Sequence, residues 1–90
     1  MKTIKELKAY LINTLPHAEI YLFGSRAKKT ESIYSDIDIA IDSDRLTAED
    51  FAQIRFAIEE SNLPYKVDLI DLTKAPYLKE TIDKEGVQWQ

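Results

Sequence analysis

Hydrophobic residues recur along the chain with two different periods, and these periods predict both helices and strands. Over residues 4–15, apolar positions three or four apart predict a helix, and Thr3 is a suitable cap for its N-terminus. The apolar run 19–23 is short and stops at Gly24, which favours a buried strand. The first part of the chain therefore predicts a helix followed by a strand.

The segment 35–42 alternates isoleucine with aspartate or another small residue. Because successive side chains of a strand point to opposite faces, this alternation predicts a half-buried strand with one polar face. Further along, apolar spacing predicts a helix within 47–63, a strand over 65–70 and a final helix over 76–84 that stops at Gly86.

Helices and strands thus alternate, with a further short helix expected at 26–29. This order predicts an α/β or α+β fold in which helices pack on a small sheet of about three to four strands. The pattern leaves the order and direction of the strands open. With 90 residues, the chain is expected to form one domain around one core. A domain of this size buries a modest fraction of its surface, so a partner or a dimer is expected.

Composition narrows the classes of function. The net charge is −4, and this argues against general nucleic-acid binding, which uses a basic face to neutralise phosphates. The chain has no cysteine, so disulfides and thiolate metal sites are excluded. No apolar run approaches the ~20 residues of a membrane span, and charged residues interrupt the N-terminal apolar positions. These features predict a soluble cytoplasmic protein.

The first motif with candidate chemistry is Gly24-Ser25-Arg26, directly after the predicted strand 19–23. Glycine allows a sharp turn and a close approach of the backbone to a ligand. The N–H groups at a helix start, with the Ser25 hydroxyl and the cations Arg26 and Lys28, suit phosphate binding. On its own, the motif also fits an ordinary strand-to-helix turn with a serine cap.

The second motif is the pair Asp36 and Asp38. Residues two apart in a strand share a face, so both carboxylates project together and repel each other. Mg²⁺ relieves this repulsion, because it prefers oxygen ligands and commonly binds one or two carboxylates together with substrate phosphates. The alternative interpretation is a charged strand that faces solvent.

The third motif is Asp68, an acidic residue between apolar neighbours in a predicted strand, which is costly unless it is paired or metal-bound. Asp71 competes with it but is expected to belong to a turn. Together, Asp36, Asp38 and Asp68 could hold two Mg²⁺ ions about 3.5–4 Å apart, as in phosphoryl-type transfer. Asp36 and Asp38 would then bridge the metals and the triphosphate, and Asp68 would bind one metal and help activate the acceptor hydroxyl.

At this point the sequence resembles the nucleotidyltransferase superfamily of DNA polymerase β, and in particular its minimal (MNT) branch. The similarity is carried by residues 22–27 (LFGSRA), by 35–40 (SDIDIA), by the later acid Asp68 and by 85–87 (EGV). It spans essentially the whole chain, which identifies 1–90 as a single minimal nucleotidyltransferase domain. One departure is Lys29, where members of this branch often have glycine.

The resemblance implies a mixed sheet, Mg²⁺ (two ions) and ATP as cofactors, and a HEPN-domain RNase toxin as partner. It implies that the protein acts as an antitoxin by transferring AMP from ATP to a toxin tyrosine. The residues carried over are Asp36, Asp38 and Asp68 for catalysis and metal binding. Those carried over for nucleotide binding are Gly24, Ser25, Arg26 and Lys28.

Two other functions fit the same residues. A binding module could neutralise a HEPN partner by complex formation alone, and an enzyme could act on a small molecule if dimerisation built its pocket. Two single residues also have an expected place. His17 is expected at the surface, in a turn. Trp89 either anchors a partner or belongs to a terminal strand that folds its indole back onto the core.

Overall fold

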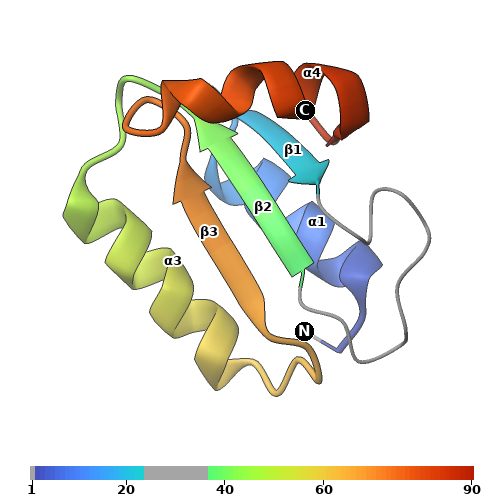
Figure 1. The fold of residues 1–90 in the computed structure, drawn as a ribbon. Helices are drawn as coiled ribbons and strands as arrows, with labels where there is room; N and C mark the ends of the chain where they lie inside the picture. The colour runs from blue at the N-terminus through green and yellow to red at the C-terminus, as the bar shows by residue number, and fades with distance from the viewer. Residues whose placement is uncertain (1, 24–36) are drawn as a thin grey trace.

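The computed structural model describes residues 2–23 and 37–90 (Figure 1). Its helices and strands lie within about three residues of the ranges expected from the sequence, and the short final strand is one of the two alternatives expected around Trp89. The short helix predicted at 26–29 lies outside the described residues. The elements are α1 (Ile4–Thr14), β1 (Glu19–Phe23), β2 (Ile37–Asp42), α3 (Ala48–Glu60), β3 (Val67–Asp71), the 3-10 helix η1 (Pro76–Leu78), α4 (Lys79–Glu85) and β4 (Val87–Gln88).

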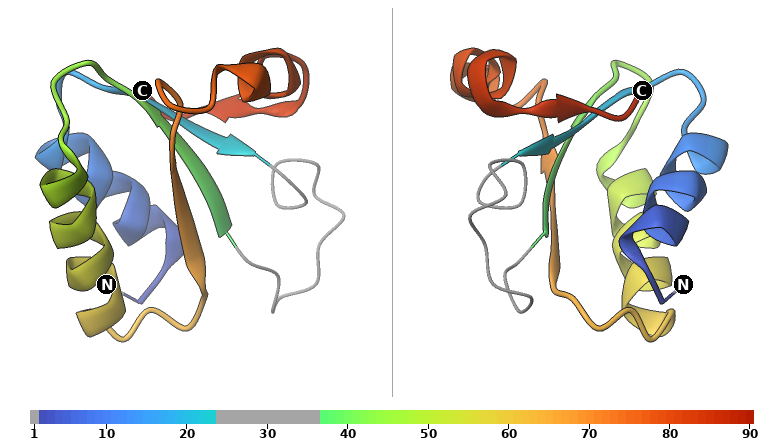
Figure 2. Two further views of the ribbon diagram at one scale, coloured as in Figure 1. Left: turned by 60° about the vertical axis from the view of Figure 1, so that its left-hand side comes forward. Right: turned by 90° about the vertical axis from the view of Figure 1, so that its right-hand side faces the viewer.

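The four strands of the described residues form one mixed sheet in the order β3-β2-β1-β4. β1 runs antiparallel to both β2 and β4, whereas β2 and β3 are parallel and are connected through α3. Figure 2 shows α1 and α3 on one face of the sheet and α4 on the other. The predicted α/β class is confirmed. The strand order, which the pattern left open, places the two aspartate-bearing strands β2 and β3 side by side.

The alternation in β2 separates the two faces of the sheet. Ile37, Ile39 and Ile41 are fully buried in the main core with residues of α1 and α3. Between them, Ala40 is buried in a smaller cluster beneath α4, together with Ile82. A shift of the strand by one residue would turn three isoleucines away from the main core, so the hydrophobic pattern fixes which face carries the aspartates.

The ends of the helices follow the predicted capping residues. The Thr3 hydroxyl accepts a hydrogen bond from the Glu6 N–H, and Thr47 forms a reciprocal capping box with Asp50. Gly86 ends α4 as predicted, but its backbone is extended, with φ −78°. Glycine is required there for space, because an added Cβ would lie 2.6 Å from the Ile82 carbonyl oxygen.

The last residues of the chain add the strand β4 to the sheet. The Trp89 N–H donates to the Ile20 carbonyl at 2.7 Å, and the Gln90 amide donates to the carbonyls of Leu15 and Ala18. The Trp89 side chain packs against the main core, as the second of its two expected placements proposed. Within the described part of the chain, no helix has the length and apolar content needed to cross a membrane.

Candidate active site on the polar face of the sheet

Two of the three predicted carboxylates lie on adjacent strands at the same level. Asp38 of β2 is the direct register partner of Asp68 of β3. Register partners on adjacent strands project from the same face of the sheet, about 4.8 Å apart between strands. Both residues are half-buried. The structure therefore brings together two hard oxygen donors from strands that are far apart in sequence.

β1 ends beside this pair. Phe23, the last residue of β1, is the register partner of Asp38. The chain therefore leaves the described sheet next to Asp38 and re-enters it at Ile37. The segment between these points includes the remaining predicted site residues. Gly24, Ser25, Arg26, Lys28 and Asp36 lie outside the described residues.

The chemistry of the described donors fits Mg²⁺. Two carboxylates at neighbouring positions, both on half-buried residues, match a cation that binds through one or two carboxylates and keeps other positions for water and phosphates. Residues 2–23 and 37–90 contain no group of three potential ligands placed to hold a metal. The third predicted carboxylate, Asp36, lies outside these described residues.

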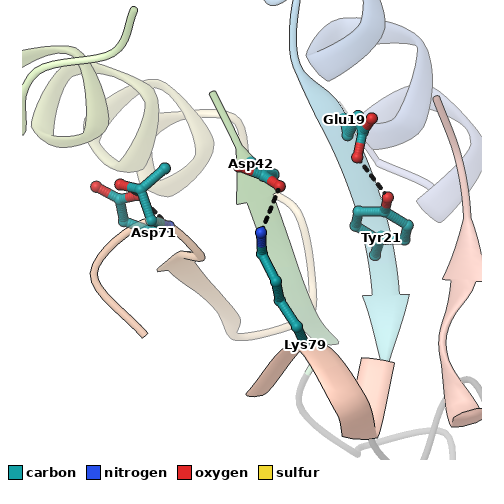
Figure 3. A network of polar contacts seen from close by, with 6 residues as sticks. Glu19, Tyr21, Asp42, Asp71 and Lys79 are labelled. Carbon is teal, nitrogen blue, oxygen red and sulfur yellow. Dashed lines mark hydrogen bonds and ion pairs between the residues drawn. The ribbon is translucent and has the colours of Figure 1, made fainter. Parts of the chain in front are cut away.

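The opposite end of the same face is also acidic but is covered by α4. There, Lys79 lies 3.7 Å from the carboxylate of Asp42, and the Tyr21 hydroxyl donates to Glu19 at 2.6 Å (Figure 3). The hydrogen bond to Glu19, and then burial, raise the pKa of Tyr21 to about 12. This cluster was not predicted from the sequence, although the period of two does place Glu19 and Tyr21 on one face.

Of the two residues set aside in the sequence, His17 lies in a turn as expected, whereas Asp71 is the last residue of β3 and directly precedes the expected turn. The Asp71 carboxylate accepts hydrogen bonds from the N–H and the hydroxyl of Thr73, at 3.0 and 2.6 Å, and so begins a turn. Asp71 is three residues from Asp68 and therefore faces the other side of the strand. His17 is exposed in the turn after α1.

A groove that was not predicted lies on the opposite side of β3, next to α3. It has a volume of about 340 Å³ and is lined by both apolar residues, such as Ile58, Leu63 and Leu69, and polar ones. The Arg55 guanidinium donates to the Leu69 carbonyl at its margin, at 3.1 Å. The sequence pattern assigns these apolar residues to the core and contains no signal for a groove.

Comparison with known proteins defines the class. The family described as "Polymerase beta, Nucleotidyltransferase" matches residues 5–88, and the chain belongs to this family of nucleotidyltransferases. Among curated proteins, the chain is similar to the probable protein adenylyltransferase MntA of Haemophilus influenzae. The two are 37% identical over 82 residues, which cover 87% of this chain and 70% of the relative.

Two solved structures share the fold. One is the toxin–antitoxin MntA–HpeT, in a variant with two aspartates, two positions apart, replaced by glutamate. Its matching chain has a TM-score of 0.77 and 27% identity, over 96% of this chain and 71% of that one. The other is a toxin–antitoxin with AMP-PNP, with a TM-score of 0.76 and 30% identity, over 97% and 73%. These matches confirm the nucleotidyltransferase fold expected from the sequence.

Proposed function

We propose that the protein is a Mg²⁺-dependent adenylyltransferase that modifies a tyrosine of a HEPN-domain toxin and thereby acts as its antitoxin in the cytoplasm. In this proposal, residues 1–90 act as one minimal nucleotidyltransferase domain. The observation that carries it is that Asp38 and Asp68 are register partners on one face of the sheet, beside the end of β1. This placement joins two motifs that are 30 residues apart in the sequence.

Asp36, Asp38 and Asp68 would hold the metal ions. When bound, Mg²⁺ would supply positive charge to the phosphate oxygens on which negative charge accumulates. Asp38 and Asp68 contribute their carboxylates from two strands whose relative position is fixed by the ladder. Because strands are more rigid than loops, this arrangement holds the donors ready before the substrate binds.

The proposed reaction is one displacement at the α-phosphorus of ATP. The acceptor oxygen forms a bond to this phosphorus, the bond to the β-phosphate bridging oxygen breaks, and pyrophosphate leaves. We assign the acceptor proton to Asp68, which lies on the outer strand of the pair. Backbone and hydroxyl groups at Gly24 and Ser25 would bind phosphates. Arg26 and Lys28 would offset the charge of the leaving pyrophosphate.

The similar proteins support this proposal. MntA of Haemophilus influenzae is described as a probable protein adenylyltransferase, and one similar structure contains AMP-PNP. In another, the two substituted aspartates have the same spacing as Asp36 and Asp38. Both similar structures are toxin–antitoxin assemblies, which supports a toxin as the acceptor.

The same assemblies favour a second candidate, a non-catalytic antitoxin that neutralises its partner by forming a complex. The two candidates differ in what they require of the carboxylates. Adenylyl transfer needs both metal-binding aspartates, whereas neutralisation by binding persists when they are replaced by asparagine.

Intact-mass spectrometry tests the proposal. The purified protein is incubated with its cognate HEPN-domain toxin, Mg²⁺ and each NTP in turn. We expect one or more AMP increments on the toxin with ATP, located on a tyrosine by fragmentation. The increment should be lost in the double variant Asp36→Asn/Asp38→Asn and kept in Asp44→Asn, an equal change of side chain at an exposed position. A toxin that is neutralised without any mass change would establish the binding module instead.

A further inference from the structure

The outer edge of the sheet beside Asp68 has main-chain groups that can accept another strand. Among the strands that the structure describes, β3 lies at the edge of the sheet, with β2 on one side only. The Ile37 N–H donates to the Lys66 carbonyl at 2.8 Å, which fixes the phase of the parallel ladder. Since backbone groups in a strand alternate in direction, the even-numbered residues of β3 face β2. The N–H and carbonyl groups of Val67 and Leu69 therefore point to the outer edge.

Only part of this edge is open. The Leu69 carbonyl accepts a hydrogen bond from Arg55, whose guanidinium also lies 5.9 Å from the centre of the Phe51 ring. Within residues 2–23 and 37–90, no ladder or loop bond uses the Val67 N–H, the Val67 carbonyl or the Leu69 N–H. The open stretch is thus centred on Asp68.

The groove beside this stretch provides a place for one large apolar side chain. It lies between α3 and β3 and has a volume of about 340 Å³ (Figure 1 shows the two elements side by side). Its apolar lining residues are Ile58, Leu63, Val67 and Leu69, and polar residues, Glu59 and Lys66 among them, line the rest. Val67 and Leu69 face this groove, whereas Asp68 between them projects to the polar face.

We infer that an extended segment of the partner toxin pairs with β3 at this stretch and delivers its acceptor tyrosine to Asp68. The inference rests on the proposed function and names the subsite for its acceptor. A strand added at an edge gains main-chain hydrogen bonds, and its alternate side chains select the sequence. With the tyrosine opposite Asp68, its ring lies on the polar face. The next residue of the segment points to the other side and fills the groove, so it is apolar.

A second copy of this chain is a poorer occupant of the same edge. The open stretch is centred on Asp68, so self-pairing of two β3 strands would place two Asp68 carboxylates directly opposite each other. Like charges at directly opposed positions destabilise a sheet. A tyrosine at the same position instead offers a hydroxyl donor to the carboxylate. The charge at the centre of the edge therefore favours the tyrosine-bearing segment.

The first test removes one edge hydrogen bond. Val67→Pro deletes an N–H that points outward, at the first residue of an edge strand, where proline is tolerated. We expect a fall of about tenfold in kcat/KM for adenylylation of the toxin and in affinity for the toxin, the size of one net hydrogen bond. The dissociation constant for ATP should not change. Val67→Ala keeps the N–H and should show a smaller loss.

A second pair of variants tests the groove without changing the backbone. Leu63→Ala enlarges the groove and should weaken toxin binding, whereas Phe56→Ala should not, because Phe56 is 64% exposed on α3 and lies outside the groove. Thermal unfolding of each variant checks that it is folded. If Val67→Pro is unfolded, the difference in toxin affinity between Leu63→Ala and Phe56→Ala decides whether the toxin binds at this edge.

The outcomes separate this inference from the proposed function. Normal AMP transfer and toxin affinity in Val67→Pro and Leu63→Ala would overturn the edge site and leave the enzyme intact. If these variants lose toxin affinity and the wild type transfers no AMP, the edge site is supported and the proposed enzymatic function is overturned. A wild-type dimer that Val67→Pro converts to a monomer, measured by light scattering, would assign the edge to a second copy and overturn the inference.

Discussion

The two ends of the polar face of the sheet are both rich in acidic residues but differ in what lies around them. At one end, Asp42 is paired with Lys79 of α4, and this helix lies over the cluster without closing it, because the Asp42 side chain is 26% exposed (Figure 3). At the other end, Asp38 and Asp68 are register partners on parallel strands, and both residues are half-buried. The number of carboxylates is thus a poor guide to a metal site, and their placement on adjacent strands is a better one.

The largest expected effect separates the two ends by function. Asp38→Asn removes one proposed metal ligand, and we expect AMP transfer to fall by roughly 10³-fold, since metal charge stabilisation contributes several kcal/mol. Asp42→Asn, the same chemical change on the same strand and face, should lower the rate less than about threefold, because a surface ion pair contributes little. Initial rates with the cognate toxin and ATP measure both. Equal losses would mean that the two ends act as one site.

The next effect concerns α4, which covers one end and not the other. In Gly86→Ala, the new Cβ would lie 2.6 Å from the Ile82 carbonyl oxygen, so the end of α4 must shift. We expect a loss of about 1–3 kcal/mol in the free energy of unfolding, as for other overpacked sites. Urea denaturation measures it, with Thr81→Ala as the control at an exposed position of the same helix. An unchanged free energy would show that α4 can end without glycine.

The same contrast explains what the sequence could predict. Strict alternation fixed the two faces of β2, because a slip would expose three isoleucines, and so Asp38 was assigned correctly to the polar face. The strand order was not predictable, since it depends on how α3 connects β2 and β3 in space. The pairing of Asp38 with Asp68 is therefore a result of the structure, although the choice of these residues came from the sequence.

Features that depend on contacts between distant segments were missed or left open. A terminal strand near Trp89 was one of two alternatives, and the sequence could not decide between them, because β4 is two residues long and pairs with β1 across the chain. The groove beside β3 depends on the distance between α3 and the sheet edge, which propensity and periodicity do not encode. The nucleotide-binding residues Gly24, Ser25, Arg26 and Lys28 remain predictions from the sequence.

A third, smaller effect tests the hydrogen bond at the covered end. The pKa of Tyr21 is raised from 10.0 to about 12, so its neutral form is favoured in the folded protein. The contribution of the Tyr21–Glu19 hydrogen bond to the free energy of unfolding is complete below pH 10. It is lost as the pH rises from 10 to 12. Tyr21→Phe should cost about 1 kcal/mol below this range and should abolish part of the alkaline loss. Urea titrations across this pH range measure both, and parallel pH profiles for the two proteins would contradict the assignment.

The smallest expected effect concerns the ion pair between Lys79 and Asp42, at the end of the face that α4 covers. The Lys79 ammonium lies 3.7 Å from Asp42, and the Lys79 side chain is 56% exposed, so solvent and salt screen the pair. Lys79→Met keeps much of the side-chain volume over β2 and should change the free energy of unfolding by about 0.5 kcal/mol or less, with the difference shrinking at high salt. It should leave AMP transfer unchanged, because Lys79 lies at the covered end. A loss of transfer in Lys79→Met, with normal stability, would instead show that the cation reaches the phosphates. The catalytic site would then extend along this face of the sheet as far as α4.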